Sequence, residues 1–270
     1  MGASFPMTHP FPEPAATAAL VARLRAAGCV FAEDEAAALL DAAGTPDELA
    51  SMAVRRIGGE PLEQVIGWAA FDGIRVRVLP GVFVPRLRTT LLVRIAAASA
   101  ARSVDSAATR IFDIGCGSGG IGAAVATRVP GVEVWAVDVD PDAVACARLN
   151  LPPERVLLGD LYAPLPDGLR AQVICANAPY VPTDAIALMP PEARDHEHRV
   201  ALDGGPDGLT VQRRVIAGAG TRLVEGGSLL IETSRAQAAL TAAAATAAGL
   251  IVTIHTDDDV EGTVVEARLA

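Results

Sequence analysis

Residues 111–120 read IFDIGCGSGG, an apolar run followed at once by a loop rich in glycine. The apolar run Ile111–Ile114 is typical of a short buried strand, because β-branched and aromatic residues fit a pleated sheet. Glycine lacks a Cβ, so the loop can turn sharply and bring its backbone close to a ligand, beside the free N–H groups of the next helix. A strand, a glycine-rich loop and a helix in this order predict an α/β fold with a ligand site at the loop.

The same rhythm of short apolar runs and alanine-rich stretches continues to the end of the chain. Continuous apolar runs favour strands that are buried on both faces, as in a parallel sheet. The further runs expected as strands are Val132–Val137, Val156–Leu158, Val173–Ala176, Leu229–Ile231, Ile251–Thr256 and Thr263–Leu269. Only a short acidic turn separates the last two, which predicts an antiparallel hairpin. We therefore predict a Rossmann-like, seven-stranded α/β domain over residues 87–270, mostly parallel with an antiparallel C-terminal hairpin.

The first third of the chain follows other patterns. Four prolines make Met1–Pro14 a predicted loose tail. Apolar residues three and four apart over residues 15–67 predict a small helical domain, in which Thr45-Pro46 marks the start of one helix. Over residues 68–86 apolar residues alternate with arginine, which predicts a β-hairpin linker with Val82–Val84 again extended.

The composition excludes some classes of function. A chain of 270 residues that is 51% hydrophobic can bury one large domain and a small one. Its net charge of −10 argues against a surface built to neutralise phosphates, so nucleic acid is not the expected partner. The start of the chain lacks the apolar core of a signal peptide, and no apolar stretch is long enough to span a membrane. We expect a soluble, cytoplasmic protein without a membrane partner.

Cysteine and histidine give no sign of a metal site. The four cysteines are scattered without a C-x-x-C pair, which suits a reducing compartment. His196 and His198 lie two residues apart in a polar segment with no third ligand nearby, so we predict a solvated loop and no bound metal. Cys116 and Cys175 have no neighbouring base and are expected to be small buried residues.

The glycine-rich loop admits more than one ligand. Gly115, Gly117 and Gly120 fit the G-x-G-x-x-G spacing of dinucleotide sites, so their spacing leaves NAD open, and a purely structural turn is a further alternative. Asp113 favours a methyl donor, because a carboxylate there would face the negative charge of a pyrophosphate but suits the ammonium group of a methionine.

Acidic residues follow the next two strands. Asp138 ends the second strand about 20 residues after the loop, where a carboxylate can accept hydrogen bonds from both ribose hydroxyls. Asp140 precedes Pro141 and is expected to cap the following helix. Asp160 follows the third strand, where it would accept from an adenine amino group or serve as a plain turn residue.

The fourth strand ends in Asn177-Ala178-Pro179-Tyr180. Ligands of open α/β sheets bind at the carboxyl ends of the strands. An asparagine followed there by a proline-stiffened turn and an aromatic ring predicts a site for a polar group, with a simple turn as the alternative.

Together these motifs resemble the HemK/PrmC family of protein glutamine N5-methyltransferases. The similarity runs from about Glu60 to the end of the chain. The matching elements are Glu60-Pro61-Leu62, Gln64, Gly67, Phe71, residues 80–86 (PGVFVPR), the glycine-rich loop, residues 177–180, residues 201–209 (ALDGGPDGL) and Leu230-Ile231-Glu232 with Gln237.

The resemblance implies a class I methyltransferase that uses S-adenosylmethionine, releases S-adenosylhomocysteine and methylates the side-chain amide nitrogen of a glutamine. The family's substrate is the Gly-Gly-Gln motif of a peptide-chain release factor, which the helical domain over residues 15–67 would help to bind. The Asn177 side-chain oxygen and the Ala178 carbonyl would accept the two N–H bonds of the glutamine, and Tyr180 would wall the pocket.

The implied residues fall into three sets. Catalytic residues are Asn177, Ala178, Pro179 and Tyr180. Cofactor-binding residues are Asp113, Gly115, Cys116, Gly117, Ser118, Gly119, Asp138, Val139, Asp160, Leu161 and Asn177. Residues at the substrate entrance are Pro85, Arg86, Arg88, Thr89 and Glu197.

The chain departs from the family pattern at two places. Ala178 stands where the family has its first proline, and it keeps the carbonyl acceptor. Leu87, Arg88 and Thr90 replace a proline and two glutamates of the family's Pro-Arg-Pro-Glu-Thr-Glu stretch. An adenine N6-methyltransferase on RNA or DNA is one alternative, with the base stacked on Tyr180. A cofactor-binding protein without catalysis is another. We expect a monomer that acts on a protein.

Overall fold

The computed structural model describes residues 14–102 and 109–270. The predicted tail therefore lies outside the described residues except for Pro14, which begins the first helix. The chain divides into two compact units between Ile66 and Gly67.

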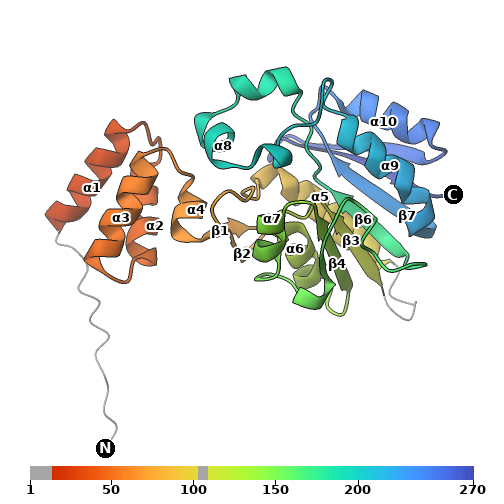
Figure 1. Ribbon diagram of the computed structural model, residues 1–270, viewed down its shortest axis with the longest axis horizontal. Helices are drawn as coiled ribbons and strands as arrows, with labels where there is room; N and C mark the ends of the chain where they lie inside the picture. The colour runs from red at the N-terminus through yellow and green to blue at the C-terminus, as the bar shows by residue number, and fades with distance from the viewer. Residues whose placement is uncertain (1–13, 103–108) are drawn as a thin grey trace, which may run out of the picture. The chain divides into compact units, whose positions relative to one another are not determined.

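The unit that ends at Ile66 is helical (Figure 1). Its helices are α1 (Pro14–Ala26), α2 (Ala32–Ala42), α3 (Pro46–Ile57) and α4 (Leu62–Ile66). Thr45 caps α3 as predicted, since its Oγ1 accepts from the Glu48 backbone N–H at 3.2 Å. Arg56 of α3 and Glu35 of α2 form an ion pair at 2.6 Å inside this unit, which satisfies both charges away from water.

The second unit begins with a hairpin. β1 (Trp68–Phe71) and β2 (Ile74–Arg77) pair antiparallel. The strand expected at Val82–Val84 is not formed in this described segment, where a single bridge joins Gly81 to Glu197. Prolines flank the segment at positions 80 and 85, and proline has no N–H to donate to a ladder.

A seven-stranded sheet of order β5-β4-β3-β6-β7-β9-β8 forms the rest of the unit. The strands are β3 (Arg110–Ile114), β4 (Glu133–Asp138), β5 (Val156–Leu158), β6 (Ala171–Ala176), β7 (Leu223–Glu232), β8 (Ile251–Asp257) and β9 (Gly262–Arg268). Strands β3 to β7 pair in parallel, and β9 pairs antiparallel with β7 and β8. The predicted sheet and its C-terminal hairpin are confirmed.

Helices cover both faces of this sheet (Figure 1). Ile111 packs with α5 (Thr90–Ala101) and α6 (Gly120–Arg128), whereas Phe112 packs with α9 (Thr210–Arg222) and α10 (Ala238–Ala247). Because side chains of a strand alternate between the faces, Asp113 shares the face of Ile111 and points toward α6.

The order of the strands fixes where a ligand can bind. β3 lies between β4 and β6. From β3 the chain adds β4 and β5 on one side, and β6 and β7 follow on the other side. The loops after β3 and β6 therefore lead in opposite directions and leave a crevice at the carboxyl ends of these strands. The connection from β6 to α9 contains three short helices, η3 (Thr183–Leu188), α8 (Pro191–His196) and η4 (Arg199–Ala201). Among the described helices none has the length and apolar character to cross a bilayer.

Candidate active site

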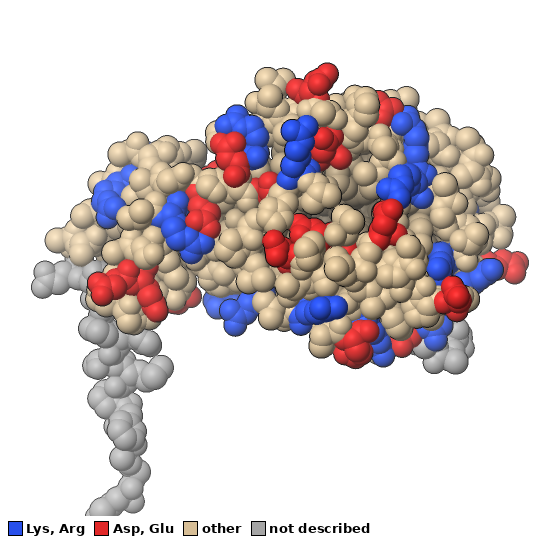
Figure 2. Space-filling model, in the orientation of Figure 1, with Lys and Arg blue, Asp and Glu red and all other residues tan. Residues whose placement is uncertain are grey.

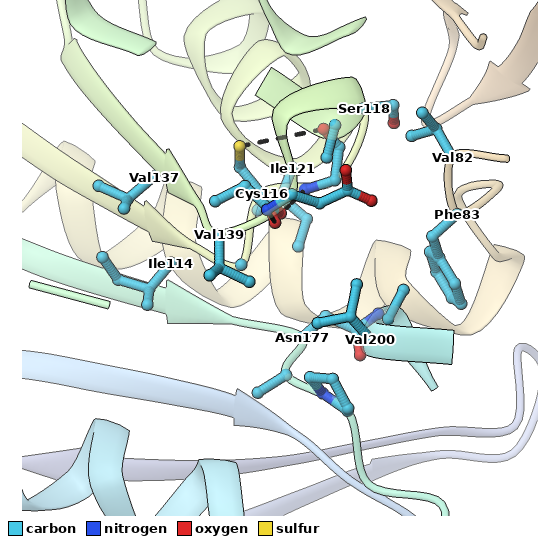
Figure 3. A pocket seen from close by; sticks show the side chains of 18 of the residues that line it. Val82, Phe83, Ile114, Cys116, Ser118, Ile121, Val137, Val139, Asn177 and Val200 are labelled. Atoms are coloured by element: carbon cyan, nitrogen blue, oxygen red, sulfur yellow. Dashed lines mark hydrogen bonds between the residues drawn. The ribbon is translucent and has the colours of Figure 1, made fainter. Parts of the chain in front are cut away.

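A cavity of about 410 Å³ lies at the carboxyl ends of β3, β4, β5 and β6. The loops that follow these strands form its walls, namely residues 114–118, 137–140, 159–161 and 177–179. Figure 3 shows Ile114 and Val137 on one side of the cavity and Phe83 on the other, with Cys116 and Val139 between them. The cavity therefore occupies the crevice that the strand order creates.

Most residues predicted from the sequence meet in this cavity. Its lining includes Gly115, Cys116, Gly117, Ser118, Asp138, Val139, Asp160, Leu161, Asn177, Ala178, Pro179, Pro85 and Thr89. The predicted residues outside the lining are Asp113, Gly119, Tyr180, Arg86, Arg88 and Glu197. Gly119 donates its N–H to the carbonyl oxygen of the lining residue Cys116 at 2.7 Å, and the contacts of the other five are described below.

The glycine-rich loop is fastened to the end of β4. The backbone N–H groups of Gly115 and Cys116 donate to the Val137 carbonyl oxygen at 2.8 and 3.1 Å. Gly117 has a φ of 54°, a left-handed conformation that L-residues avoid, and its N–H donates to Asp138 Oδ2 at 2.8 Å. These bonds hold the loop open toward the cavity. Cys116 and Cys175 are buried as expected, and burial raises the pKa of both thiols well above the usual value, which disfavours the thiolate form.

Asp138 faces the cavity with a carboxylate that already holds two backbone groups. Besides the Gly117 N–H, it accepts the Asp140 N–H on Oδ1 at 3.0 Å. Burial raises the pKa of Asp138, and the N–H groups of Asp140 and Gly117 oppose this shift. Each carboxylate oxygen keeps a second lone pair, so the group can still accept from a hydroxyl of a ligand.

Asp113 lies behind the loop rather than in the cavity. It is fully buried, and its Oδ2 accepts the Gly122 N–H of α6 at 3.0 Å. Burial raises its pKa to about 7, although the Gly122 hydrogen bond opposes the rise. Contact with a ligand ammonium therefore stays a prediction, and the observed contact joins β3 to the helix that follows the loop.

Asp160 carries a partner that the sequence did not reveal. Its Oδ2 is 2.5 Å from Nη2 of Arg214 on α9, and both residues line the cavity. Arg214 is one of several arginines along α9, so no feature of the sequence distinguishes it. Val200 also lines the cavity and was missed, because the run Val200-Ala201-Leu202 gives no sign of which residue faces a ligand.

The loop that follows β6 contacts Thr89, which lines the cavity, and Gln237 and Gly204, which do not. Asn177 Nδ2 lies 3.3 Å from Thr89 Oγ1. Gln237 Nε2 donates to the Tyr180 carbonyl oxygen at 2.9 Å. A Cβ at Gly204 would lie 2.7 Å from the Pro179 carbonyl oxygen, so only glycine allows this close approach.

The expected entrance residues Arg86 and Glu197 form an ion pair, called the brace below, in which Glu197 is buried and Arg86 is partly exposed. Arg86 Nη2 is 2.5 Å from Glu197 Oε1, and the Glu197 side chain is fully buried. The same oxygen accepts the Val84 N–H at 3.1 Å, while the guanidinium of Arg86 lies 5.0 Å from the centre of the Phe83 ring. This brace joins the connection before α9 to the segment that carries Phe83 and Pro85, which line the cavity.

Tyr180 and Arg88 meet a buried carboxylate instead of the cavity. Arg88 Nε is 3.3 Å from Oε1 of Glu232, the last residue of β7. Burial raises the pKa of Tyr180, and Glu232 raises it further while Arg88 opposes the rise. The phenol lies with this charge pair, and Tyr180 is not among the lining residues of the cavity. Its role as a wall of the pocket stays a prediction.

His198, in the segment predicted to be a solvated loop, is 40% exposed and makes contacts that the sequence did not predict. His198 Nδ1 is 2.6 Å from Asp140 Oδ2, its N–H donates to the Gly81 carbonyl oxygen at 2.9 Å, and its ring occupies the space that a side chain at Gly81 would need. Asp140 also caps α7 (Pro141–Ala147) as predicted, accepting the Asp142 N–H at 2.9 Å. Atoms of Asp140, Asp142 and His198 that could bind a cation lie within 4.8 Å of one another. The contact of 2.6 Å between His198 Nδ1 and Asp140 Oδ2 is a hydrogen bond, which joins the segment after α8 to the loop after β4 beside the cavity.

Known proteins share this chain's sequence over most of its length. Residues 74–189 match the family model described as methyltransferase small domain. A release factor glutamine methyltransferase from Geobacter sulfurreducens is 38% identical over 200 residues, which cover 72% of this chain and 68% of that protein. The protein of the same name from Bradyrhizobium diazoefficiens is 32% identical over 256 residues, which cover 86% of each chain.

Solved structures share the fold. A 16S rRNA N2 methyltransferase of T. thermophilus, in complex with AdoMet and guanosine, is 20% identical with a TM-score of 0.51, over 75% of this chain and 50% of that one. A methyltransferase from Pyrococcus furiosus is 15% identical with the same TM-score of 0.51, over 73% and 88%. Because the relatives are 32–38% identical and are covered over two thirds of their length or more, the chain belongs to the family of release factor glutamine methyltransferases.

Proposed function

We propose that this chain transfers the methyl group of S-adenosylmethionine to the side-chain amide nitrogen of a glutamine, in the Gly-Gly-Gln motif of a peptide-chain release factor. The observation that carries the proposal is the position of Asn177. Its side chain lines the cavity beside Ala178 and has its nitrogen directed to Thr89, so its oxygen is available to a ligand.

The residues around the cavity fit S-adenosylmethionine. Asp138 offers carboxylate oxygens for the ribose hydroxyls, and Val139 and Leu161 offer apolar walls for the adenine ring. Asp160 lies where one of its carboxylate oxygens would accept from the adenine amino group while Arg214 stays bound to the other. When bound, S-adenosylmethionine supplies an electrophilic methyl group on a sulfonium, which becomes a neutral thioether as the methyl leaves.

An amide nitrogen is a weak nucleophile because its lone pair is delocalised into the carbonyl. The Asn177 oxygen and the Ala178 carbonyl would accept the two N–H bonds of the substrate amide and hold its nitrogen in line with the methyl group. Their negative ends also stabilise the positive charge that develops on the nitrogen as the new carbon–nitrogen bond forms. No strong base is required, since a proton can leave to water after the transfer.

Surface charge supports a protein substrate over nucleic acid. Figure 2 shows basic and acidic side chains interspersed on the face drawn, in keeping with a net charge of −10. Nucleic-acid binding relies on clustered basic residues. The adenine alternative also needs a base stacked on Tyr180, whose side chain lies with Arg88 and Glu232 outside the cavity lining.

The test is methyl transfer from radiolabelled S-adenosylmethionine to release factors of the same organism. The purified chain is incubated with each factor carrying Gly-Gly-Gln and with the matched factor in which this Gln is replaced by Ala. We expect label on the first and none on the second. Total RNA from the same cells is the control for the adenine alternative.

Other outcomes are equally informative. Label on RNA would overturn the protein substrate. Label on another protein, with none on the release factors, would keep glutamine methylation only if mass spectrometry finds the added methyl on a glutamine amide. Binding of S-adenosylmethionine without transfer to any fraction would favour the non-catalytic alternative.

A further inference from the structure

The side-chain amide of Asn177 has two orientations with opposite consequences. Its Oδ1 and Nδ2 are similar in size, and a half-turn about the last side-chain bond exchanges them. Only Oδ1 can accept a hydrogen bond from an N–H group of a substrate amide. With Nδ2 in its place, the Asn177 NH₂ group and the substrate NH₂ group would face each other as two donors. The groups behind Asn177 therefore decide whether the cavity presents an acceptor.

Two acceptors lie beside this amide, one on Thr89 at the cavity wall and one on Glu232 outside the cavity lining. Thr89 Oγ1 is 3.3 Å from Asn177 Nδ2, and Thr89 is only 2% exposed. Glu232 follows from the sheet register: Ala176 of β6 pairs with Ile231 of β7, so the residues after them, Asn177 and Glu232, are neighbours at the ends of adjacent strands. Burial raises the pKa of Glu232, and the neighbouring Thr89, Arg88 and Asn177 side chains oppose this rise. Glu232 Oε2 is buried and has no partner within hydrogen-bonding geometry among the described residues.

Arg88 supplies the positive charge that this buried carboxylate needs. Its Nε is 3.3 Å from Glu232 Oε1, and the Glu232 side chain is only 1% exposed. An ionised carboxylate has acceptors and no donor. Turning the Asn177 oxygen toward it would place two acceptors face to face and leave both without a hydrogen, which is costly in a buried site.

We propose that Glu232 and Thr89, with Arg88 holding Glu232, are positioning residues that fix the Asn177 amide with Oδ1 toward the cavity. The effect of this amide orientation on turnover rests on the proposed function, whereas the orientation itself is a property of this chain alone.

Paired variants of Thr89 and Glu232 test the proposal. Thr89→Val removes the acceptor and keeps the shape, and Thr89→Ser restores the hydroxyl. Glu232→Gln places a donor where a carboxylate stood. We expect kcat on the release factor to fall about tenfold or more in Thr89→Val and Glu232→Gln, with the Kd of S-adenosylmethionine within about twofold. Thr89→Ser should keep most of the turnover.

The matched control is Glu133→Gln. Glu133 is the first residue of β4 in the same sheet, and it forms an ion pair with Arg110. Its substitution should leave kcat unchanged. Tryptophan fluorescence during thermal unfolding establishes that each variant is folded.

The side-chain amide of Asn177 gives a readout that does not depend on turnover. In a 15N-labelled protein, its NH₂ resonances are assigned by their loss in Asn177→Asp. We expect slow exchange of these protons with water in the wild type and faster exchange in Thr89→Val and Glu232→Gln. Unchanged exchange, or wild-type kcat in both folded variants, would overturn the proposal. If the wild type labels no release factor, the proposed function fails, and the amide exchange still decides the orientation.

Discussion

Gln237 Nε2 donates to the Tyr180 carbonyl oxygen at 2.9 Å, which ties the loop after β6 to the start of α10. Gly208 lies against this bond. A Cβ at position 208 would collide with both Gln237 Nε2 and the Tyr180 carbonyl oxygen. The placement of the Asn177 loop thus depends on a residue without a side chain.

Gly208→Ala should therefore displace the loop and lower kcat by about tenfold or more, because small misplacements of reacting groups are costly. Gly226→Ala is the matched control. The two glycines have φ values of 74° and 72°, but no atom lies within 4 Å of a Cβ at Gly226. Both variants should lose about 1 kcal/mol of unfolding free energy from the left-handed backbone. Equal kcat values in the two variants would contradict the prediction.

Asn177→Ala removes the proposed side-chain acceptor. Loss of one preorganised acceptor should lower kcat about a hundredfold. The Kd of S-adenosylmethionine is measured beside it by calorimetry, to separate the loss of turnover from a loss of binding. Methylation at the wild-type rate would show that the amide acceptor lies elsewhere.

Asp138→Asn replaces one carboxylate oxygen by a donor. That donor would face either a ribose hydroxyl or one of the N–H groups that Asp138 now accepts. The Kd of S-adenosylmethionine should rise about tenfold or more, since hydrogen bonds to charged groups are the strong ones. Asp184→Asn, at an exposed position of η3, should leave Kd unchanged. An unaltered Kd in Asp138→Asn would remove Asp138 from the cofactor site.

Arg86→Met leaves the carboxylate of Glu197 buried with less compensation. The free energy of unfolding should fall by about 2 kcal/mol or more. Arg199→Met is the control, because Arg199 is 69% exposed in its pair with Asp203, and such pairs contribute less than about 1 kcal/mol. Urea unfolding followed by tryptophan fluorescence suits the measurement, since Trp68 and Trp135 both lie in the unit that begins at Gly67. Equal losses would argue against a special role for the brace.

Asp113 should make stability depend on pH. Its pKa is about 7 when folded, above the reference value of 3.8, so the folded state holds this proton over a range where the unfolded state has lost it. This group therefore reduces stability as pH rises from about 4 to about 7. Asp113→Asn cannot ionise, and its unfolding free energy relative to the wild type should increase with pH. A difference that stays constant from pH 5 to about pH 8 would contradict the assigned pKa.

The sequence was sufficient for the strands with continuous apolar runs. β3 was expected at Ile111–Ile114 and begins one residue earlier, whereas β7 was expected at Leu229–Ile231 and begins at Leu223. Gly226 and Gly227 interrupt the apolar pattern of β7, but its pairing with β6 continues across an irregular register between Ala171 and Val173. Such pairing depends on the neighbouring strand and is invisible in a local pattern.

The candidate site divides in the same way. Residues such as Gly117, Asp138 and Asn177 could be predicted, because each lies at or within three residues of the carboxyl end of a strand, and these ends lie at one edge of a parallel sheet. The partnership of Asn177 with Glu232 could not, since it depends on β6 and β7 being adjacent. The same holds for His198, whose partner Asp140 is 58 residues away in the sequence.

The Arg88–Glu232 pair also limits how this chain can diverge. Replacing Arg88 alone by glutamate would bring a second carboxylate close to the buried Glu232, with repulsion in place of attraction. Substitutions at position 88 are therefore limited to residues that leave the charge of Glu232 compensated.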